Sequence, residues 1–335
     1  MKKTLTIILG LTREGKFTYP SLLSNVLIPL DSDLAFCGSA NSDEPDPILE
    51  NSRFVWNEPD PTDWSAACDS ISLDYGSWRE FGKVPSNLLT GSFPNQTAGP
   101  GMIFAYRWEI LRQHITEEIL NSYEWFVITR SDFLWEIEHP SINLLQKDKI
   151  YQMDGYTYGG ITDRHFIFHR ENARKIIALA QPIFNEDVDI KNKFVATLGN
   201  ATWHNRPLDH LNFEQYLLFM TREFGLEKKL TLIPYLGYLI RHYETSTNWS
   251  SGVFYPSRNY YIKYPNELAA VSLNKLFLRS QKEWLSFFNN AITRRVLSFF
   301  NNAITRKLLL YFHNLRNRFL IKFSKNQKQN YLEAI

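Results

Sequence analysis

Cysteine and long runs of apolar residues are both scarce in this sequence. Cys37 and Cys68 are the only cysteines among 335 residues. Two thiols cannot form the disulfide framework of a small secreted protein, and they are typical of a reduced, cytosolic chain. No stretch has the roughly 20 consecutive apolar residues that a transmembrane helix needs.

The apolar run near the N-terminus is short as well. Leu5 to Leu9 follow two lysines, but charged residues begin again at Arg13, and no small-residue cleavage site precedes them. A secretory signal needs a longer apolar stretch and such a site. We therefore expect Leu5–Leu9 to form a buried strand.

Acidic residues are nearly absent between Lys275 and Lys328. This segment has twelve Lys and Arg residues and one acid, Glu283, a net charge of +11. Because the whole chain carries +2, the rest carries −9. An acidic body argues against a nucleic-acid reader, which is expected to carry basic residues on its folded body.

The basic segment is rich in Leu and Phe, a composition typical of an interfacial amphipathic helix. We expect residues 248–335 to form a basic amphipathic helical tail that binds an anionic membrane surface; the alternative is a helix packed on the body or in an oligomer. Leu285 to Arg294 recur identically as Leu297 to Arg306. A spacing of 12 residues does not return to the same helix face, so we interpret the repeat as a tandem duplication.

The remaining chain has the pattern of an α/β domain. Hydrophobic residues make up 44% of the sequence, enough for a sizeable core. Trp125 to Ile128 form an aromatic and β-branched run, which predicts a strand buried on both faces, as in a parallel sheet. Apolar residues at helical spacing predict a helix from about Met102 to Leu120 before it. Further expected elements are a helix over 20–30, helices over 170–179, 185–198 and 209–224, and strands over 34–37, 149–152, 164–168, 230–232 and 238–242.

Polar residues appear abruptly where the central strand should end, as Thr129-Arg130-Ser131-Asp132. In open α/β sheets, ligands bind beyond the carboxyl ends of the strands. The strand ending in Arg-Ser-Asp resembles the variant DXD position of GT-A-type glycosyltransferases, and more narrowly the glycosyltransferase-like proteins of bacterial surface-polysaccharide gene clusters. The resemblance implies that Asp132 holds a divalent cation, Mn²⁺ or Mg²⁺, and that Arg130 contacts the donor diphosphate. Arg130 stands where the first Asp of that pattern would be, so we expect weak metal dependence.

A second segment expected to contribute to the donor site is Gly10-Leu11-Thr12-Arg13, which follows the strand expected over Leu5–Leu9. Gly10 permits a close approach of the backbone, and Arg13 would project where a phosphate could bind. In the proteins that this chain resembles, such a turn opens the nucleotide-sugar site, which assigns Gly10, Thr12 and Arg13 to donor binding. A surface turn is the alternative.

The segment Tyr158 to Phe168 also resembles these proteins, in their acceptor-side loop and strand. The resemblance implies that Asp163 lies near the reaction centre and acts as the catalytic base, with Glu214 as the second choice. Turn capping for Asp163 and a helix N-terminal role for Glu214 are the alternatives. His242, on a late predicted strand, is a candidate ligand of the diphosphate, although a single His on a strand often has only a structural role.

These observations predict a GT-A-like, Rossmann-like three-layer α/β/α sandwich over residues 1–247, with an irregular insertion over 38–101, followed by the basic helical appendage. The resemblance implies a glycosyltransferase that moves a sugar from a nucleotide-sugar donor to a glycan or lipid-linked glycan in surface polysaccharide synthesis, lipopolysaccharide included. We expect it in the cytoplasm, peripheral at the inner face of the membrane. The alternative is a non-catalytic protein that binds membrane or nucleic acid through its tail.

Overall fold

A computed structural model describes residues 2–289, except 41–44, 74–77, 83–99, 156, 186, 198–201, 204–205, 208–211, 245–251 and 257. The chain forms two compact units. The first comprises Met1–Asp132 and Ser141–Ile233, and the second comprises Phe133–Pro140 and the chain from Pro234 onward. This division differs from the boundary expected after residue 247, because Phe133–Trp135 pair with a strand that begins at Gly237.

The first unit contains a seven-stranded sheet with the order β10-β6-β7-β4-β1-β2-β3. Its strands are β1 (Thr4–Leu9), β2 (Ser32–Gly38), β3 (Phe54–Asn57), β4 (Trp125–Thr129), β6 (Ile150–Met153), β7 (Phe166–His169) and β10 (Leu230–Ile233). β7 runs antiparallel to both of its neighbours, β4 and β6. The other four pairs are parallel. The sheet is therefore mixed rather than wholly parallel.

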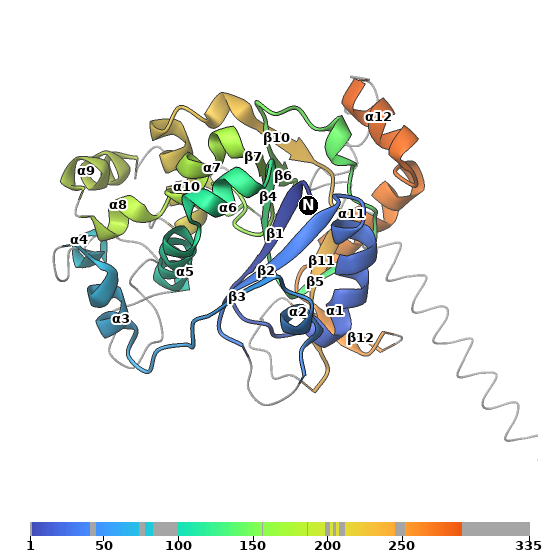
Figure 1. Cartoon of the computed structure of the whole chain (residues 1–335), viewed down its shortest axis with the longest axis horizontal. Coiled ribbons are helices and arrows are strands. Elements are labelled where there is room, and N and C mark those ends of the chain that lie inside the picture. The colour runs from blue at the N-terminus through green and yellow to red at the C-terminus, as the bar shows by residue number, and fades with distance from the viewer. Residues whose placement is uncertain are drawn as a thin grey trace, which may run out of the picture. The chain divides into compact units, whose positions relative to one another are not determined.

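Helices cover both faces of this sheet. They are α1 (Gly15–Leu22), the π-helix η1 (Leu23–Leu27), α2 (Pro47–Glu50), α3 (Trp64–Ile71), α4 (Trp78–Gly82), α5 (Pro100–His114), α6 (Glu117–Ser122), α7 (Arg170–Ile177), α8 (Gln181–Phe184), α9 (Val188–Ala196) and α10 (Phe213–Glu223). Figure 1 shows α1 and α2 on one side of the sheet and α5, α6 and α7 on the other. The predicted α/β/α sandwich is confirmed, and it is consistent with a GT-A-like, Rossmann-type fold.

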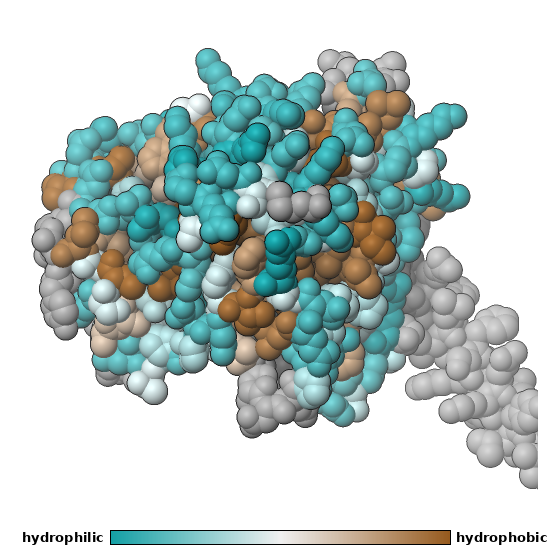
Figure 2. All heavy atoms as spheres, in the orientation of Figure 1, coloured by the Kyte–Doolittle hydropathy of each residue, from teal (hydrophilic) through white to brown (hydrophobic). Residues whose placement is uncertain are grey.

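The two faces of β1 explain the three layers. Alternate residues of a strand point to opposite faces. Leu5 and Ile7 join the large apolar cluster that includes Trp108 of α5. Thr4 faces the other way, and its hydroxyl donates to the carbonyl of Leu30 at 2.8 Å, in the segment that follows η1. Hydrophilic residues predominate on the face of the molecule drawn in Figure 2, with apolar residues in separate groups.

The tail expected to be helical over 248–335 begins instead with two strands, Val253–Tyr255 and Tyr260–Ile262. Three predicted segments of the first unit also differ from the structure. The single helix expected over 102–120 is two helices, because Thr116 caps the N-terminus of α6 with its hydroxyl. The insertion expected to be irregular over 38–101 contributes β3 to the sheet edge, beside β2. The helix expected from Pro20 begins earlier, at Gly15, and continues as a π-helix.

The second unit contains a four-stranded antiparallel sheet with the order β12-β13-β11-β5. Its strands are β5 (Phe133–Trp135), β11 (Gly237–His242), β12 (Val253–Tyr255) and β13 (Tyr260–Ile262), and its helices are α11 (Pro265–Phe277) and α12 (Gln281–Asn289). The Trp284 indole is buried and donates to the carbonyl of Glu138 at 2.9 Å, which fixes α12 to the segment after β5.

The remaining predicted tail, residues 290–335, lies outside the described residues, and so do the second copy of the repeat and half of the first. Short elements complete the described chain: the 3₁₀ turns Ile142–Leu144 and Glu227–Lys229, and the strands Thr202–Trp203 and Arg206–Pro207. Within residues 2–289 as described, no helix is long and apolar enough to cross a membrane.

Candidate functional site

A pocket of about 270 Å³ lies in the first unit at the carboxyl ends of β1 and β4. Ligands of open α/β folds bind at this edge of the sheet. Five of the predicted site residues line the pocket: Gly10, Arg13, Arg130, Asp132 and Asp163. Segments far apart in the sequence therefore meet at one place, as the sequence predicts for the ends of adjacent strands.

The turn after β1 requires glycine and carries strain. Gly10 has a φ of +118°, in the region that favours glycine, and its N–H donates to the carbonyl of Cys37 at 2.9 Å. Gly38, at the end of β2, lies so close that a Cβ there would come within 1.7 Å of the Gly10 carbonyl oxygen. Arg13 itself has a positive φ of 36°. Such strain in a non-glycine residue is common at ligand sites.

Two side-chain hydrogen bonds join the end of β4 to the turn after β1 and to α1, which follows that turn. The Ser131 hydroxyl donates to the carbonyl of Leu11, and the Thr18 hydroxyl donates to the carbonyl of Ser131. Both Ser131 and Thr18 are buried. These bonds hold the backbone beside Arg13 and the backbone beside Arg130 in a fixed relation.

Arg130 and Asp132 form a two-pronged ion pair. Arg130 Nε lies 2.9 Å from Asp132 Oδ1, and Nη2 lies 2.9 Å from Oδ2. Arg13 Nη1 lies 3.8 Å from the same Oδ2. Asp132 is 1% exposed. Burial lowers the pKa of Arg130, but the charges of Asp132 and Asp163 raise it by more, so the guanidinium stays protonated. Arg13, Arg130 and Asp132 together carry a net charge of +1.

Asp163 reaches the pocket because β7 is antiparallel to β4. Ile128, near the end of β4, pairs with Phe166 at the start of β7. The Thr129 hydroxyl also donates to the carbonyl of Arg164 at 3.2 Å. Unlike Asp132, the carboxylate of Asp163 makes no hydrogen bond or ion pair with another described residue. It is therefore the lining acid best placed to accept a proton from a ligand.

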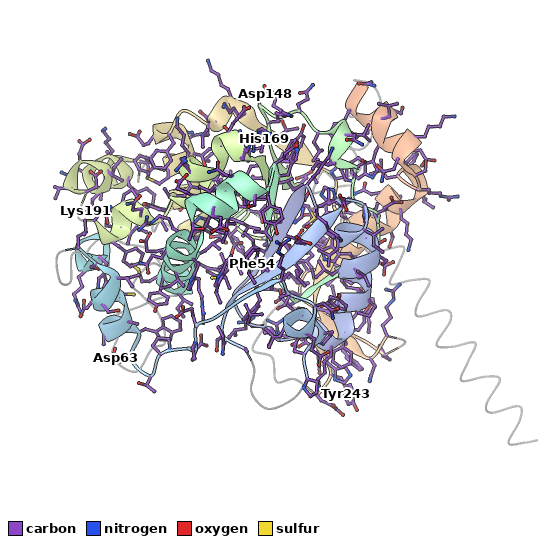
Figure 3. The ribbon with its side chains drawn as sticks, in the orientation of Figure 1. Phe54, Asp63, Asp148, His169, Lys191 and Tyr243 are labelled. Atoms are coloured by element: carbon purple, nitrogen blue, oxygen red, sulfur yellow. The ribbon has the colours of Figure 1, made fainter. Side chains whose placement is uncertain are left out.

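The pocket also has an aromatic wall that the sequence did not assign to the site. Phe104 and Trp108 come from α5, and Trp64 comes from the start of α3. The Arg130 guanidinium lies over the Phe104 ring, 5.7 Å from its centroid. Asp63 caps α3 by accepting from the Ser65 N–H at 2.8 Å, and Figure 3 shows it on this helix. Apolar residues at helical spacing in α5 predict burial, but not which positions face a ligand.

A second acid–arginine pair completes the lining. Arg107 of α5 donates to the carboxylate of Asp60 and, at 2.9 Å, to the carbonyl of Glu58. Arg107 is buried, whereas the Asp60 side chain is 46% exposed. The Pro-Asp-Pro sequence around Asp60 predicts a turn, but nothing in it points to the pocket.

Three predicted site residues do not line the pocket. Thr12 is buried beside it, and its N–H donates to the carbonyl of Ser39 at 3.3 Å. Glu214 lies at the start of α10, where its carbonyl accepts from the Ile161 N–H at 3.0 Å. His242 belongs to β11 of the second unit, where its Nδ1 lies 3.7 Å from a carboxylate oxygen of Glu244.

The donor set around Asp132 fits a divalent cation poorly. Mg²⁺ and Mn²⁺ are bound by several oxygen ligands, mostly carboxylates. Both oxygens of Asp132 already accept hydrogen bonds from Arg130, with Arg13 close by. No group of three or more Asp, Glu, His or Cys side chains within the described part of the chain could share a metal ion. A cation on Asp132 stays a prediction that these contacts do not favour.

Comparison with solved structures gives likenesses in structure, but the comparisons with family models and curated sequences find no match. The apo crystal structure of mouse xyloside xylosyltransferase 1 is similar with a TM-score of 0.35 and 10% identity, over 70% of this chain and 85% of that one. A likeness of this extent does not establish a shared activity, so the function has to be argued from the pocket.

Proposed function

We propose that this chain is a glycosyltransferase that moves a sugar from a nucleotide-sugar donor to a hydroxyl group of a glycan or lipid-linked glycan. The observation that carries the proposal is the meeting of Arg13, Arg130 and Asp163 in one pocket at the carboxyl edge of the sheet. Sugar transfer from a nucleotide needs positive charge at the leaving diphosphate and a base at the acceptor. The two arginines and the aspartate supply these groups.

In this proposal the arginines bind the diphosphate. Guanidinium groups match phosphate oxygens with paired hydrogen bonds. Asp132 acts as a positioning residue, because its two bonds to Arg130 fix the plane of that guanidinium. The leaving group is then neutralised by protein charge, and no step requires a metal ion.

Asp163 acts as the base. The acceptor oxygen attacks the anomeric carbon, and the bond from that carbon to the phosphate oxygen breaks. The electron pair of the broken bond goes to the diphosphate, which Arg13 and Arg130 stabilise, and the acceptor proton goes to Asp163. A single displacement of this kind inverts the anomeric configuration. Glu214 remains the second candidate base.

The membrane part of the proposal comes from the sequence. The net +11 between Lys275 and Lys328 would draw the chain to an anionic surface, at about 1 kcal/mol for each basic residue near it. We propose that the enzyme works at the inner face of the membrane on a surface-polysaccharide precursor. The alternative, a protein that only binds through its tail, would have no need of the pocket.

A panel of nucleotide sugars tests the function. The full chain is incubated with each donor and a mixture of glycan acceptors, and released nucleoside diphosphate is measured. We expect turnover with at least one donor and a loss of about 100-fold or more in Asp163→Asn, since general base catalysis contributes roughly 10²–10⁴-fold. A Glu117→Gln variant, which alters an exposed acid of α6, is the control. Equal turnover in Asp163→Asn and the control would remove Asp163 as the base.

A further inference from the structure

The second unit has a pocket of its own, with a volume of about 410 Å³. It is bounded by the segment after β5, the residues before β13 and one side of α11. Its lining residues are Glu136, Arg258, Leu268, Val271, Ser272, Lys275, Leu276 and Arg279. Three of these are basic and one is acidic, so the lining carries a net charge of +2.

Glu136 organises the basic residues. Its carboxylate accepts from Arg258 Nη1 at 2.5 Å and from Lys275 Nζ at 2.8 Å. The Tyr238 hydroxyl also donates to it, at 3.0 Å. Burial raises the pKa of Glu136, but the bonds from Lys275 and Arg258 outweigh that effect and lower it to about 2. At neutral pH the Glu136 carboxylate therefore holds the Arg258 and Lys275 side chains in place, and the three groups together carry a net charge of +1.

Arg258 is oriented with much of its donor capacity unused. Its Nη1 is also 2.6 Å from the Tyr238 hydroxyl and 3.2 Å from the Tyr260 hydroxyl. Its Nε and Nη2 make no hydrogen bond to another described residue, and its side chain is 44% exposed. A guanidinium fixed on one nitrogen and open on the others is prepared to bind an oxyanion in two-pronged fashion.

Arg279 adds a third positive charge. Its backbone N–H donates to Glu283 at 2.9 Å, but its side chain makes no hydrogen bond or ion pair within residues 2–289 as described. Apolar residues of α11 line the pocket beside it. Leu268 and Val271 are buried, and Leu276 is 56% exposed. A ligand that contacts both the basic and the apolar residues of this lining needs a negatively charged group and an apolar part.

We propose that this pocket of the second unit binds a phosphate group, presented either by the headgroup of an anionic lipid or by a soluble phosphate ester. Three basic side chains and one carboxylate give a net charge of +2, which is complementary to the negative charge of a phosphate group. The planar guanidinium of Arg258 can donate paired hydrogen bonds to two phosphate oxygens. This inference is independent of the proposed sugar transfer, which concerns the first unit. It extends the membrane proposal from the sequence of the tail to a built site within the described chain.

A matched pair of variants tests the site. Arg279→Gln and Lys282→Gln remove the same charge from exposed positions in the second unit, but only Arg279 lines the pocket. Affinities of the full chain are measured by calorimetry for dihexanoyl phosphatidic acid below its micelle concentration and for glycerol 3-phosphate. We expect Arg279→Gln to weaken binding about tenfold, as loss of a charge-assisted hydrogen bond does, and Lys282→Gln to change it less than twofold.

Arg258→Lys provides a second test that keeps the charge and removes the planar fork. It should also bind about tenfold more weakly, with its folding checked by circular dichroism. Tighter binding of phosphatidic acid than of glycerol 3-phosphate would assign the site to a lipid headgroup, and equal binding would assign it to the phosphate alone. Equal losses in Arg279→Gln and Lys282→Gln, or no binding of either ligand at millimolar concentration, would overturn the proposal.

Discussion

Arg130 holds both carboxylate oxygens of Asp132, with Nε and Nη2 each 2.9 Å from its acceptor. Both carboxylate oxygens of Asp132, which follows β4, therefore already accept hydrogen bonds from the arginine two residues earlier. This relationship changes the meaning of the Arg-Ser-Asp motif. In the proposed function, Asp132 positions the Arg130 guanidinium, and its oxygens are not required as ligands of a metal ion.

The first prediction concerns this pair. Asp132→Asn and Arg130→Lys should each lower kcat/KM for transfer by about 100-fold or more, the usual cost of losing one preorganised contact to developing charge. The double variant should be little worse than either single variant, because the two residues act as one unit. Additive losses would contradict this, since they would mean that Asp132 acts separately from Arg130.

The second prediction concerns metal ions. Because Arg13 and Arg130 already supply positive charge, millimolar EDTA should leave most of the transfer rate intact, and added Mn²⁺ should raise it only a few-fold. The measurement is nucleoside diphosphate release in metal-free buffer across a Mn²⁺ titration. If micromolar EDTA abolishes nucleoside diphosphate release and trace Mn²⁺ restores it, then a metal ion, and not Arg13 and Arg130, neutralises the leaving diphosphate.

The third prediction concerns the loop that carries Asp163. A Cβ on Gly160 would lie 2.0 Å from the carbonyl oxygen of Glu214, so Gly160→Ala must displace the loop from α10. We expect a loss of about 1–3 kcal/mol in stability and a large loss of transfer rate. Gly225→Ala is the control, because its φ of +69° is strained in alanine but no atom lies within 4 Å. It should cost about 1 kcal/mol and leave transfer unchanged. Equal transfer in both variants would separate the loop from catalysis.

The fourth prediction concerns acid stability. Glu136 has a pKa of about 2 in the fold against an ordinary 4.5. A depressed pKa contributes stability above pH 4.5, here up to about 3 kcal/mol, which is lost as the pH falls toward 2. The melting temperature of the wild type should therefore fall more steeply between pH 4.5 and pH 2 than that of Glu136→Gln. Parallel curves would mean that Glu136 is not stabilised by its basic partners.

Strands of the sheet were predictable where apolar residues run together. β1, β2 and β4 begin and end within two residues of the expected runs, because buried strands need continuous apolar sequence. β3 was not predicted, since Phe54–Asn57 is a four-residue edge strand with alternating exposure, flanked by polar residues and prolines. The break between α5 and α6 had a signal in Thr116, a good N-cap followed by two acids.

The site was predictable only in part. Arg13 and Arg130 follow two adjacent parallel strands, so their meeting is a consequence of sheet geometry. Asp163 joins them because β7 runs antiparallel to β4, which short apolar runs do not reveal. Trp64 and Asp60 arrive from the insertion, whose path the sequence does not specify. Asp63 before Trp64 is a local signal, because an N-cap residue marks where α3 begins.

The central claim is that two arginines, and not a cation, hold the nucleoside diphosphate. Calorimetric titration of the full chain with UDP and GDP in EDTA tests it most directly. We expect binding of at least one nucleotide, weakened about tenfold or more in Arg13→Gln and in Arg130→Gln. Arg174→Gln, which removes an exposed arginine of α7, should bind as the wild type does. Binding that disappears in EDTA, or that all three variants weaken equally, would contradict the account.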